Sequence, residues 1–251
     1  MRVTRVAVAM AVLCGAAWGQ RFDVASIKPN RARGASTIEF EIGGQRFSAT
    51  NMPLGALILV AYDITVRQLS GPGEALSERY DVLAKAERPI KAGELRQMLQ
   101  ALLADRFRLR VRRETREVPV FALTLAKGGP KLRHSDQSEA DAAARRTPAA
   151  AGGTESGRGR YIFKNESMAD FAWALTRMAG ISDRVVVDQT ALNGRYDFEL
   201  AFEREDAAGG DGSQGPSIFA AVQERLGLRL VPSKAPVEFI IVDRVEKPSE
   251  N

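Results

Sequence analysis

Residues 79–82 read Arg-Tyr-Asp-Val, and residues 195–198 read Arg-Tyr-Asp-Phe. Two further pairs of segments align in the same order: residues 45–51 (Gln-Arg-Phe-Ser-Ala-Thr-Asn) with 159–165 (Gly-Arg-Tyr-Ile-Phe-Lys-Asn), and 105–111 (Asp-Arg-Phe-Arg-Leu-Arg-Val) with 224–230 (Glu-Arg-Leu-Gly-Leu-Arg-Leu). Self-similarity at a fixed spacing is typical of a repeated structural unit. The sequence therefore predicts that residues 45–126 and 159–243 are two divergent copies of one unit.

Each copy is predicted to run strand, helix, strand, strand, helix, strand. Apolar residues recur at the spacing of one helix face in four segments: Leu54, Leu57, Ile58 and Ala61; Leu95, Met98, Leu99, Leu102 and Leu103; Met168, Phe171, Leu175 and Met178; and Ile218, Phe219, Val222 and Leu226. The Arg-Tyr-Asp segments alternate polar and apolar residues, as half-buried strands do. The predicted fold class is α+β, with two pseudo-repeated units packed as two lobes.

Local signals mark the ends of several elements. Ser167 and Asp170 have the spacing of a capping box at a helix start. Asn193-Gly194 is a strong turn signal, so the segments on either side of it, 185–187 and 195–202, are predicted to form a hairpin. Each copy is also predicted to close with a strand that begins at a proline, over residues 119–125 and 236–242 respectively.

The chain is predicted to divide into four parts. These are a signal peptide at 1–19, a first lobe with an N-terminal strand region at 20–133, a flexible linker at 134–158 and a second lobe at 159–251. The leader is predicted from its basic head, a short apolar run and small residues before Gln20. A retained membrane anchor and, through Cys14, a lipoprotein are the alternatives.

The composition limits the classes of partner. Because Cys14 is the only cysteine, a cleaved chain has none and forms no disulfide. Loss of Arg2 and Arg5 lowers the formal net charge to +5 − 2 = +3. The 36 basic residues are dispersed among 31 acidic ones, which disfavours a nucleic-acid partner. No transmembrane segment is expected after cleavage.

The sequence offers few reactive side chains. The one histidine, His134, lies at the edge of the predicted linker, where no neighbour is expected to orient it. One histidine and no mature cysteine disfavour the usual zinc sites and leave Ser-His or Cys-His machinery without parts. We therefore expect no catalytic residue, no cofactor and no metal.

Two aspartates leave one enzymatic alternative open. Asp81 and Asp197 occupy equivalent positions of the two copies and could meet in a cleft as a catalytic carboxylate pair. The alternative is structural, since an arginine lies two residues away on the same strand face and can pair with the carboxylate or across strands. The motif positions expected to have structural roles are Arg79, Tyr80, Asp81, Arg195, Tyr196 and Asp197.

Six segments together resemble one known family of exported proteins, a large paralogous group expanded in acidobacterial soil bacteria of the Solibacter type. They are residues 22–30 (Phe-Asp-Val-Ala-Ser-Ile-Lys-Pro-Asn), 101–107 (Ala-Leu-Leu-Ala-Asp-Arg-Phe), 114–120 (Glu-Thr-Arg-Glu-Val-Pro-Val), 126–132 (Ala-Lys-Gly-Gly-Pro-Lys-Leu), 194–198 (Gly-Arg-Tyr-Asp-Phe) and 234–238 (Lys-Ala-Pro-Val-Glu). The resemblance implies export, a repeated α+β domain and no established activity. Similar domains occur attached to membrane metallopeptidases that resemble β-lactam sensors, although this chain has no His-Glu-x-x-His segment.

A second resemblance concerns the pattern of elements alone. A helix, short strands, a Gly-Arg turn, a second helix ending in Leu-Gly-Leu and a closing hairpin are similar to the small N-terminal domains of secretins and TonB-dependent receptors, which are interaction modules. We therefore expect an exported, non-catalytic binding or interaction module of the cell envelope, periplasmic or extracellular, with an unknown protein or small-molecule partner. The alternatives are a carboxylate-based hydrolase of unfamiliar type and a soluble ligand-sensing domain related to membrane sensor-peptidases.

Overall fold

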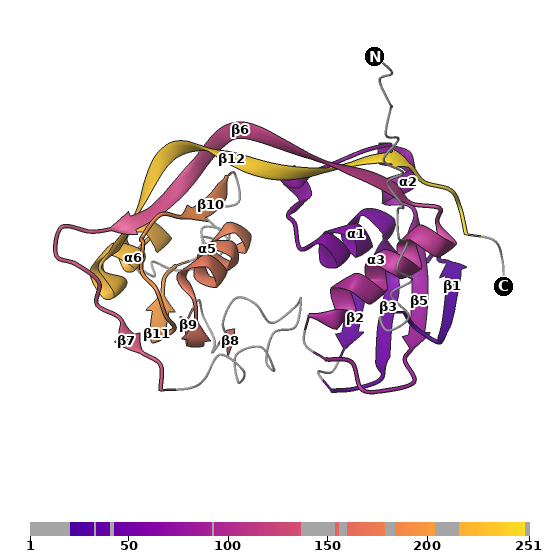
Figure 1. The fold of residues 1–251 in the computed structure, drawn as a ribbon, viewed down its shortest axis with the longest axis horizontal. Coiled ribbons are helices and arrows are strands. Elements are labelled where there is room, and N and C mark those ends of the chain that lie inside the picture. Colours follow the sequence, from indigo (N-terminus) through magenta and orange to yellow (C-terminus); the bar gives the residue numbers. More distant parts are fainter. Residues whose placement is uncertain are drawn as a thin grey trace, which may run out of the picture.

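The protein consists of two lobes joined by a long two-stranded ribbon (Figure 1). The computed structural model describes residues 21–32, 34–40, 43–91, 93–136, 154–155, 160–178, 184–203 and 216–248. Helices and three four-stranded sheets are mixed along the chain, which confirms the predicted α+β class. The predicted signal peptide lies outside the described residues, as do residues 137–153 and 156–158 of the predicted linker.

The first lobe is a sheet covered on one face by two helices. The sheet has the order β1-β5-β3-β2, with β1 Val24–Pro29, β5 Arg79–Lys85, β3 Arg46–Pro53 and β2 Thr37–Phe40. All of its pairings are antiparallel. The covering helices are α1 Leu54–Tyr62 and α3 Glu94–Arg106, and the short helix α2 Gly73–Ser77 precedes β5. Both long helices bury the apolar residues that their periodicity predicted.

The second lobe has the same kinds of element. Its sheet has the order β7-β11-β9-β8, with β7 Arg133–His134, β11 Tyr196–Ala201, β9 Arg160–Glu166 and β8 Thr154–Glu155. The helices are α5 Met168–Arg177 and α6 Ile218–Leu226. At the start of α5 the Ser167 hydroxyl accepts the Asp170 amide at 3.1 Å, as the capping signal predicted. It donates in turn to the Asp170 carboxylate at 2.7 Å.

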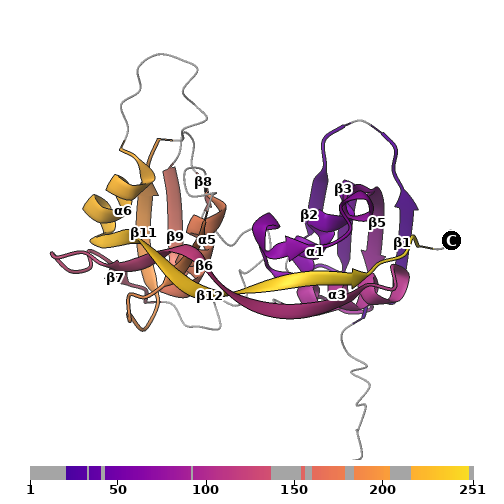
Figure 2. The ribbon, with the colours of Figure 1, turned by 90° about the horizontal axis from the view of Figure 1, so that it is seen from above.

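The ribbon exchanges the closing strands of the two lobes. Strand β6 (Arg110–Leu125) begins beside α3 in the first lobe and buries Phe121 and Leu123 in the core of the second. Strand β12 (Leu228–Arg244) runs the other way and buries Ile240 and Val242 in the core of the first. The two strands pair antiparallel along nearly their whole length, with Glu117 opposite Pro236 near the middle (Figures 1 and 2). Each lobe therefore depends on a strand from the other half of the chain.

A short strand extends the ribbon at each end. Strand β10 (Val185–Asp188) pairs parallel with β6, and strand β4 (Leu69–Ser70) pairs parallel with β12. The resulting sheet has the order β10-β6-β12-β4. The order of elements thus agrees between the two halves, while their duplication stays a prediction from the sequence.

Several expectations from the sequence are wrong. The Asn193-Gly194 turn does not join β10 to β11 as a hairpin, because β10 pairs with β6 and β11 pairs with β9 and β7. The closing strands start well before their prolines, and each of them runs from one lobe into the core of the other. Phe219 was predicted to face inward but is 37% exposed, with its ring 5.3 Å from that of Phe121.

Candidate binding groove

The Arg-Tyr-Asp segment of the first lobe holds a bulge in the neighbouring strand. The register of β3 against β5 shifts between Ala49 and Met52, and Asn51 between them has a left-handed φ of 52°. The Asp81 carboxylate accepts the Asn51 amide at 2.8 Å, and the Arg79 guanidinium donates to the Asn51 carbonyl at 2.7 Å. Both charged side chains therefore satisfy the backbone of one buried residue.

The second lobe repeats this arrangement. Asn165 of β9 is buried, with a φ of 54°, and the register shifts between Tyr196 and Phe198 on β11. The Asp197 carboxylate accepts the Asn165 amide at 2.8 Å, and the Arg195 guanidinium donates to the Asn165 carbonyl at 2.8 Å. In each lobe the arginine and the aspartate act on the same asparagine of the adjacent strand.

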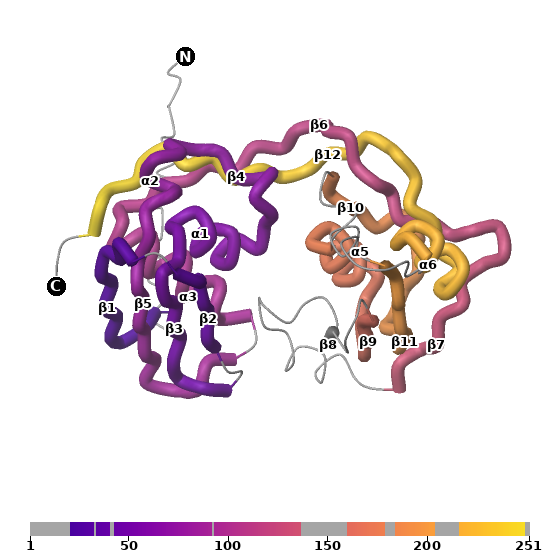
Figure 3. Tube along the Cα trace, turned by 180° about the vertical axis from the view of Figure 1, so that it is seen from behind, coloured from indigo at the N-terminus to yellow at the C-terminus, as the bar shows by residue number. Residues whose placement is uncertain are grey.

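The two aspartates lie on β5 and β11, which belong to different sheets, one in each lobe (Figure 3). The hydrogen bonds from the Asn30 side chain and the Asn51 amide lower the pKa of Asp81. Burial acts to raise the pKa of Asp197, but the Asn165 amide and the Ser135 hydroxyl lower it on balance. Each carboxylate is therefore held ionised at neutral pH.

The tyrosines of the two segments are core residues. Tyr80 is 2% exposed and packs edge-on against Phe107 with ring centroids 4.9 Å apart. Burial, together with the hydrogen bond to Glu78, raises the pKa of the Tyr80 phenol. Tyr196 is 4% exposed and donates to the Asn193 carbonyl at 2.9 Å. The six residues singled out from the sequence thus lie in β5 and β11 or, for Arg195, directly before β11.

The expectation that His134 lacks an orienting neighbour is wrong. Strand β7 pairs with β11, which places His134 opposite Tyr196. The imidazole lies over the Tyr196 ring with centroids 4.6 Å apart. The pairing of β7 with the edge of the sheet orients the His134 side chain. His134 and Tyr196 are far apart in the sequence, so no local pattern predicts this contact.

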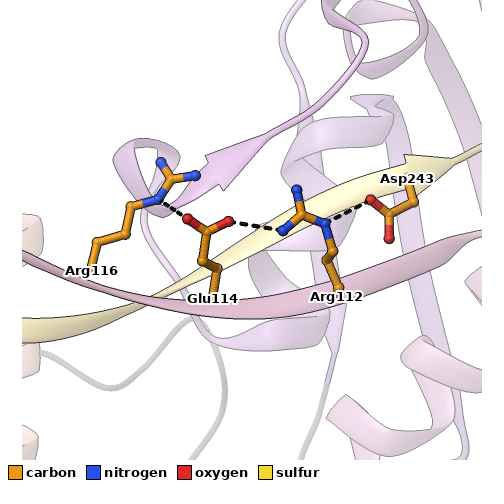
Figure 4. A network of polar contacts seen from close by, with 4 residues as sticks. All are labelled: Arg112, Glu114, Arg116 and Asp243. Atoms are coloured by element: carbon orange, nitrogen blue, oxygen red, sulfur yellow. Dashed lines mark hydrogen bonds and ion pairs between the residues drawn. The ribbon is translucent and has the colours of Figure 1, made fainter.

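The ribbon between the lobes carries a row of alternating charges (Figure 4). The Glu114 carboxylate accepts from Arg116 at 2.7 Å and from Arg112 at 2.9 Å, and Arg112 also donates to Asp243 at 3.0 Å. Arg116 and then Arg112 lower the pKa of Glu114 to about 2. These arginines are matched by carboxylates on the ribbon itself, so they do not form a basic patch for a polyanion.

A groove of about 270 Å³ lies between the lobes, at the ends of α1 and α5 that face each other beneath the ribbon (Figure 3). The first lobe contributes Leu59, Ile64, Thr65, Val66 and Arg67, and the second contributes Thr176, Arg177 and Arg184. The described lining residues thus include three arginines and no carboxylate. This groove, defined by those eight residues, is the strongest candidate for a binding site.

The second-lobe wall is positioned by one buried threonine. Thr176 donates to the Ala172 carbonyl at 3.0 Å and accepts the Val186 amide at 2.9 Å, which ties the end of α5 to the start of β10. Arg177 follows that threonine, and Arg184 precedes the tied amide by two residues. The two guanidinium groups therefore come to one rim of the groove.

Two aromatic rings lie against these guanidinium groups. Arg177 lies 4.7 Å from the centroid of Trp173, and Arg184 lies 5.0 Å from that of Phe121. Such stacking attracts a cation and restricts its side chain. Trp173 also reaches the first lobe, donating through Nε1 to the Asp63 carbonyl at 3.4 Å.

The first-lobe wall is held against the ribbon. Arg67 lies on the 3-10 turn η1 Val66–Gln68, where Thr65 and Gln68 form a capping box. The Gln68 side chain donates to the Glu238 carbonyl of β12 at 3.0 Å. The turn, and with it Arg67, is thereby anchored to the exchanged strand.

A second depression, of about 340 Å³, lies within the first lobe. It is lined by Arg21, Asp23, Ala86, Glu87, Arg88, Ile90, Glu94 and Met98. Its charges are mixed, and the Arg88–Glu94 ion pair at 2.9 Å spans part of the lining. The groove between the lobes is lined by residues of both lobes and is therefore the better candidate.

Sequence reasoning missed the groove arginines altogether. They come from two short segments and a helix end, and the fold alone brings them together. The only available signal was Arg177 in the last turn of a predicted helix, where a cation is favoured by the helix dipole whatever its function. Among the described residues, no three His, Cys, Asp or Glu side chains are grouped to hold a metal ion, and no helix has the length and apolar character to cross a membrane.

These features define a two-lobed α+β protein with exchanged closing strands and a basic groove between its lobes. The chain belongs to the family described as "protein of unknown function (DUF3738)", whose model matches residues 55–245. The predicted resemblance to a family without an assigned function is confirmed, while its acidobacterial expansion and its association with metallopeptidases stay predictions. No curated protein and no solved structure matches the chain.

Proposed function

We propose that this protein is an exported, non-catalytic binding module of the cell envelope that holds a small ligand in the groove between its lobes. The observation that carries the proposal is a groove lined from both lobes, with three arginines placed by aromatic stacking or by anchored backbone. Ligand sites are typically clefts of roughly 300–1,000 Å³, often between domains. At about 270 Å³ the groove is slightly smaller than that range, which favours a small molecule over a folded partner.

The non-catalytic part of the proposal is supported by the positions of the carboxylates. Catalysis by Asp81 and Asp197 would require them to act together on one substrate. Each instead accepts the amide of a buried asparagine in its own lobe. The proposal predicts no hydrolysis of a glycoside and ester panel, and turnover that disappears in a still-folded Asp81→Asn/Asp197→Asn double variant would contradict it.

Export is proposed from the basic head and apolar run of residues 1–19. The protein recovered from the cell envelope or the medium is expected to begin near Gln20, which intact-mass measurement would show. Recovery of a chain that still carries Met1 would contradict cleavage.

The groove is tested by filling it. Val66 lines the groove and is 71% exposed, so Val66→Phe adds bulk there without disturbing a core. Val24 on β1 is 67% exposed and provides the matched control Val24→Phe. A library of neutral, cationic and anionic small molecules is screened by thermal shift, since a ligand of the folded state raises the melting temperature.

The proposal expects compounds that stabilise the parent protein and Val24→Phe but have a clearly smaller effect on Val66→Phe. Hits that stabilise all three proteins equally, or a library without hits, would overturn the groove as the binding site.

A further inference from the structure

We propose that the ribbon is a self-complementary interface, through which the first half of one copy of the chain is completed by the second half of another. Two copies then form a dimer by reciprocal exchange of halves. The first half runs to residue 136 and contains β6, and the second half starts at residue 154 and contains β12. The inference is independent of any ligand of the groove.

The pairing of the ribbon strands is symmetric about one point. In the two aligned segments of sequence that lead into β6 and β12, equivalent positions differ by 119 in residue number. Glu117 and Pro236 differ by this number and are partners in the ribbon. The pairs on either side of them are equivalent to each other: Val118 with Ala235 and Arg116 with Val237. An interface in which residue i contacts j and j contacts i is that of a twofold dimer.

The two ends of the ribbon enter the lobes in the same way (Figure 2). Phe121 lies in the core of the second lobe, and Ile240, at the equivalent position, lies in the core of the first. Leu123 and Val242 are related in the same manner. Phe121 also pairs with the parallel strand β10, as Ile240 pairs with β4. Each half therefore gives the other a closing strand and receives an equivalent one in return.

These contacts do not depend on whether both halves belong to one chain. The covalent connection between the halves leaves β7 and enters β8, and both of these strands lie in the second lobe. Residues 135–153, fully extended, reach roughly 60 Å, so the connection is long enough to pass from one two-lobed particle to another. Within one chain it raises the local concentration of the partner half. A monomer is therefore favoured in dilute solution, and exchange is favoured when the two halves of one copy no longer fit each other.

Complementation between two defective copies tests the exchange. Leu123→Asp disables the first half, because Leu123 is 0% exposed in the core of the second lobe. Ile240→Asp disables the second half, because Ile240 is 0% exposed in the core of the first lobe. A carboxylate buried in an apolar core is strongly destabilising. Each full-length variant alone should therefore lose the parent's melting transition.

Mixing the two variants should restore that transition. In the mixed dimer, the intact first half of the Ile240→Asp variant meets the intact second half of the Leu123→Asp variant, which gives one complete particle without either substitution. The two variants carry different affinity tags and are refolded together from urea at equal concentrations. We expect a folded species that contains both tags, has the mass of two chains by light scattering and melts within a few degrees of the parent.

The matched control places both defects in the same half. Leu228→Asp disables the second half, as Ile240→Asp does, because Leu228 of β12 is 0% exposed in the core of the second lobe. A mixture of these two variants contains no intact second half, so the parent's transition should not return. Recovery in the first mixture alone supports the inference, and equal recovery in both mixtures overturns it.

A second measurement needs no defective variant and decides the matter if neither mixture recovers. The parent chain, with a protease site inserted between residues 136 and 154, is cut after folding, in one unlabelled batch and one ¹⁵N-labelled batch. The two batches are mixed, unfolded in urea and refolded. Native mass spectrometry should then show particles that combine an unlabelled first half with a labelled second half. Halves that do not reassemble after cutting would show that their recognition requires the covalent connection, which overturns the inference.

Discussion

Gly227 ends α6 in the left-handed region, with a φ of 65°. Its replacement by alanine tests the packing of the turn before β7 on this helix end. A Cβ at this position would lie 2.0 Å from the Gly129 carbonyl oxygen and 3.1 Å from the Lys131 amide nitrogen. The turn before β7 therefore rests directly on the helix end. It is held there by a hydrogen bond from the Lys131 amide to the Leu226 carbonyl at 2.8 Å and one from the Ala126 amide to Gly227 at 3.0 Å.

The expected loss has two parts. A non-glycine residue in the left-handed region costs roughly 1–2 kcal/mol, and moving the turn away breaks one or both hydrogen bonds at about 1 kcal/mol each. Gly227→Ala should therefore lower the free energy of unfolding by roughly 2–4 kcal/mol. For a chain of this size the melting temperature should fall by roughly 5–15 °C, which thermal and urea unfolding followed by circular dichroism would measure.

Gly93 provides the control. It also has a left-handed φ, of 86°, but a Cβ there would meet nothing within 4 Å. Gly93→Ala should lose only the backbone part, roughly 1–2 kcal/mol. Equal losses for the two variants would refute the packing of the turn onto the end of α6.

Three further predictions concern the aspartates that bind the buried asparagine amides, the ribbon, and the core of the second lobe. Asp81→Asn and Asp197→Asn each replace a charged acceptor of an asparagine amide by a neutral one, so each should lose about 1 kcal/mol of stability. If urea unfolding showed a loss for only one of the two variants, the aspartates would not have the same structural role in the two lobes. Because the folded state lowers the pKa of Glu114 to about 2, its contribution to stability is present above pH 4.5 and is lost as pH falls toward 2. Glu114→Gln should accordingly reduce the loss of stability between pH 5 and pH 2.5, and an unchanged profile would show that the ribbon network contributes nothing. Phe163→Ala removes a ring that is 1% exposed and should cost roughly 3–5 kcal/mol, whereas Leu83→Ala, at a side chain 57% exposed, should stay within about 0.5 kcal/mol; similar melting temperatures would contradict the assignment of Phe163 to the core.

The helices could be predicted from the sequence because their signals are local. The apolar spacing in α1 and α3 selects the residues that are buried, and Ser167 caps α5 as its spacing predicted. The helical spacing gives the wrong burial where a residue packs against a strand that is distant in the sequence. Phe219 has the spacing of an inward residue but meets Phe121, which β6 delivers from the first lobe, at the edge of the core.

The exchange of strands could not be predicted because it depends on partners far away in sequence. Residues 185–187 are a run of three valines followed by a turn signal, as in a hairpin strand, but the strand pairs instead with residues 120–123, which lie far away in the sequence. Strands β6 and β12 contain no glycine or asparagine at which the chain could fold back, a feature visible in the sequence that the proline-based prediction overlooked.

The groove could not be predicted for a related reason. Arg67 and Arg184 lie in short segments without a motif, and more than a hundred residues of chain separate them. They line the same groove because both segments are attached to the ribbon. The turn η1 is hydrogen-bonded to β12 through Gln68, and β10 is paired with β6, where Val186 lies opposite Phe121.

Occupancy of the groove can be observed directly in the arginine side chains that line it. The full chain is labelled with ¹⁵N-arginine, and its Nε–Hε resonances are followed by NMR as a compound that stabilises the parent protein, but has a smaller effect on Val66→Phe, is added. Arg67→Gln, Arg177→Gln and Arg184→Gln identify the three groove signals by their disappearance, and Arg229→Gln identifies a reference signal. We expect the three groove resonances to shift together with one saturation curve while that of Arg229 stays in place. Shifts confined to arginines outside the groove, or no shift at a saturating concentration of that compound, would contradict the account.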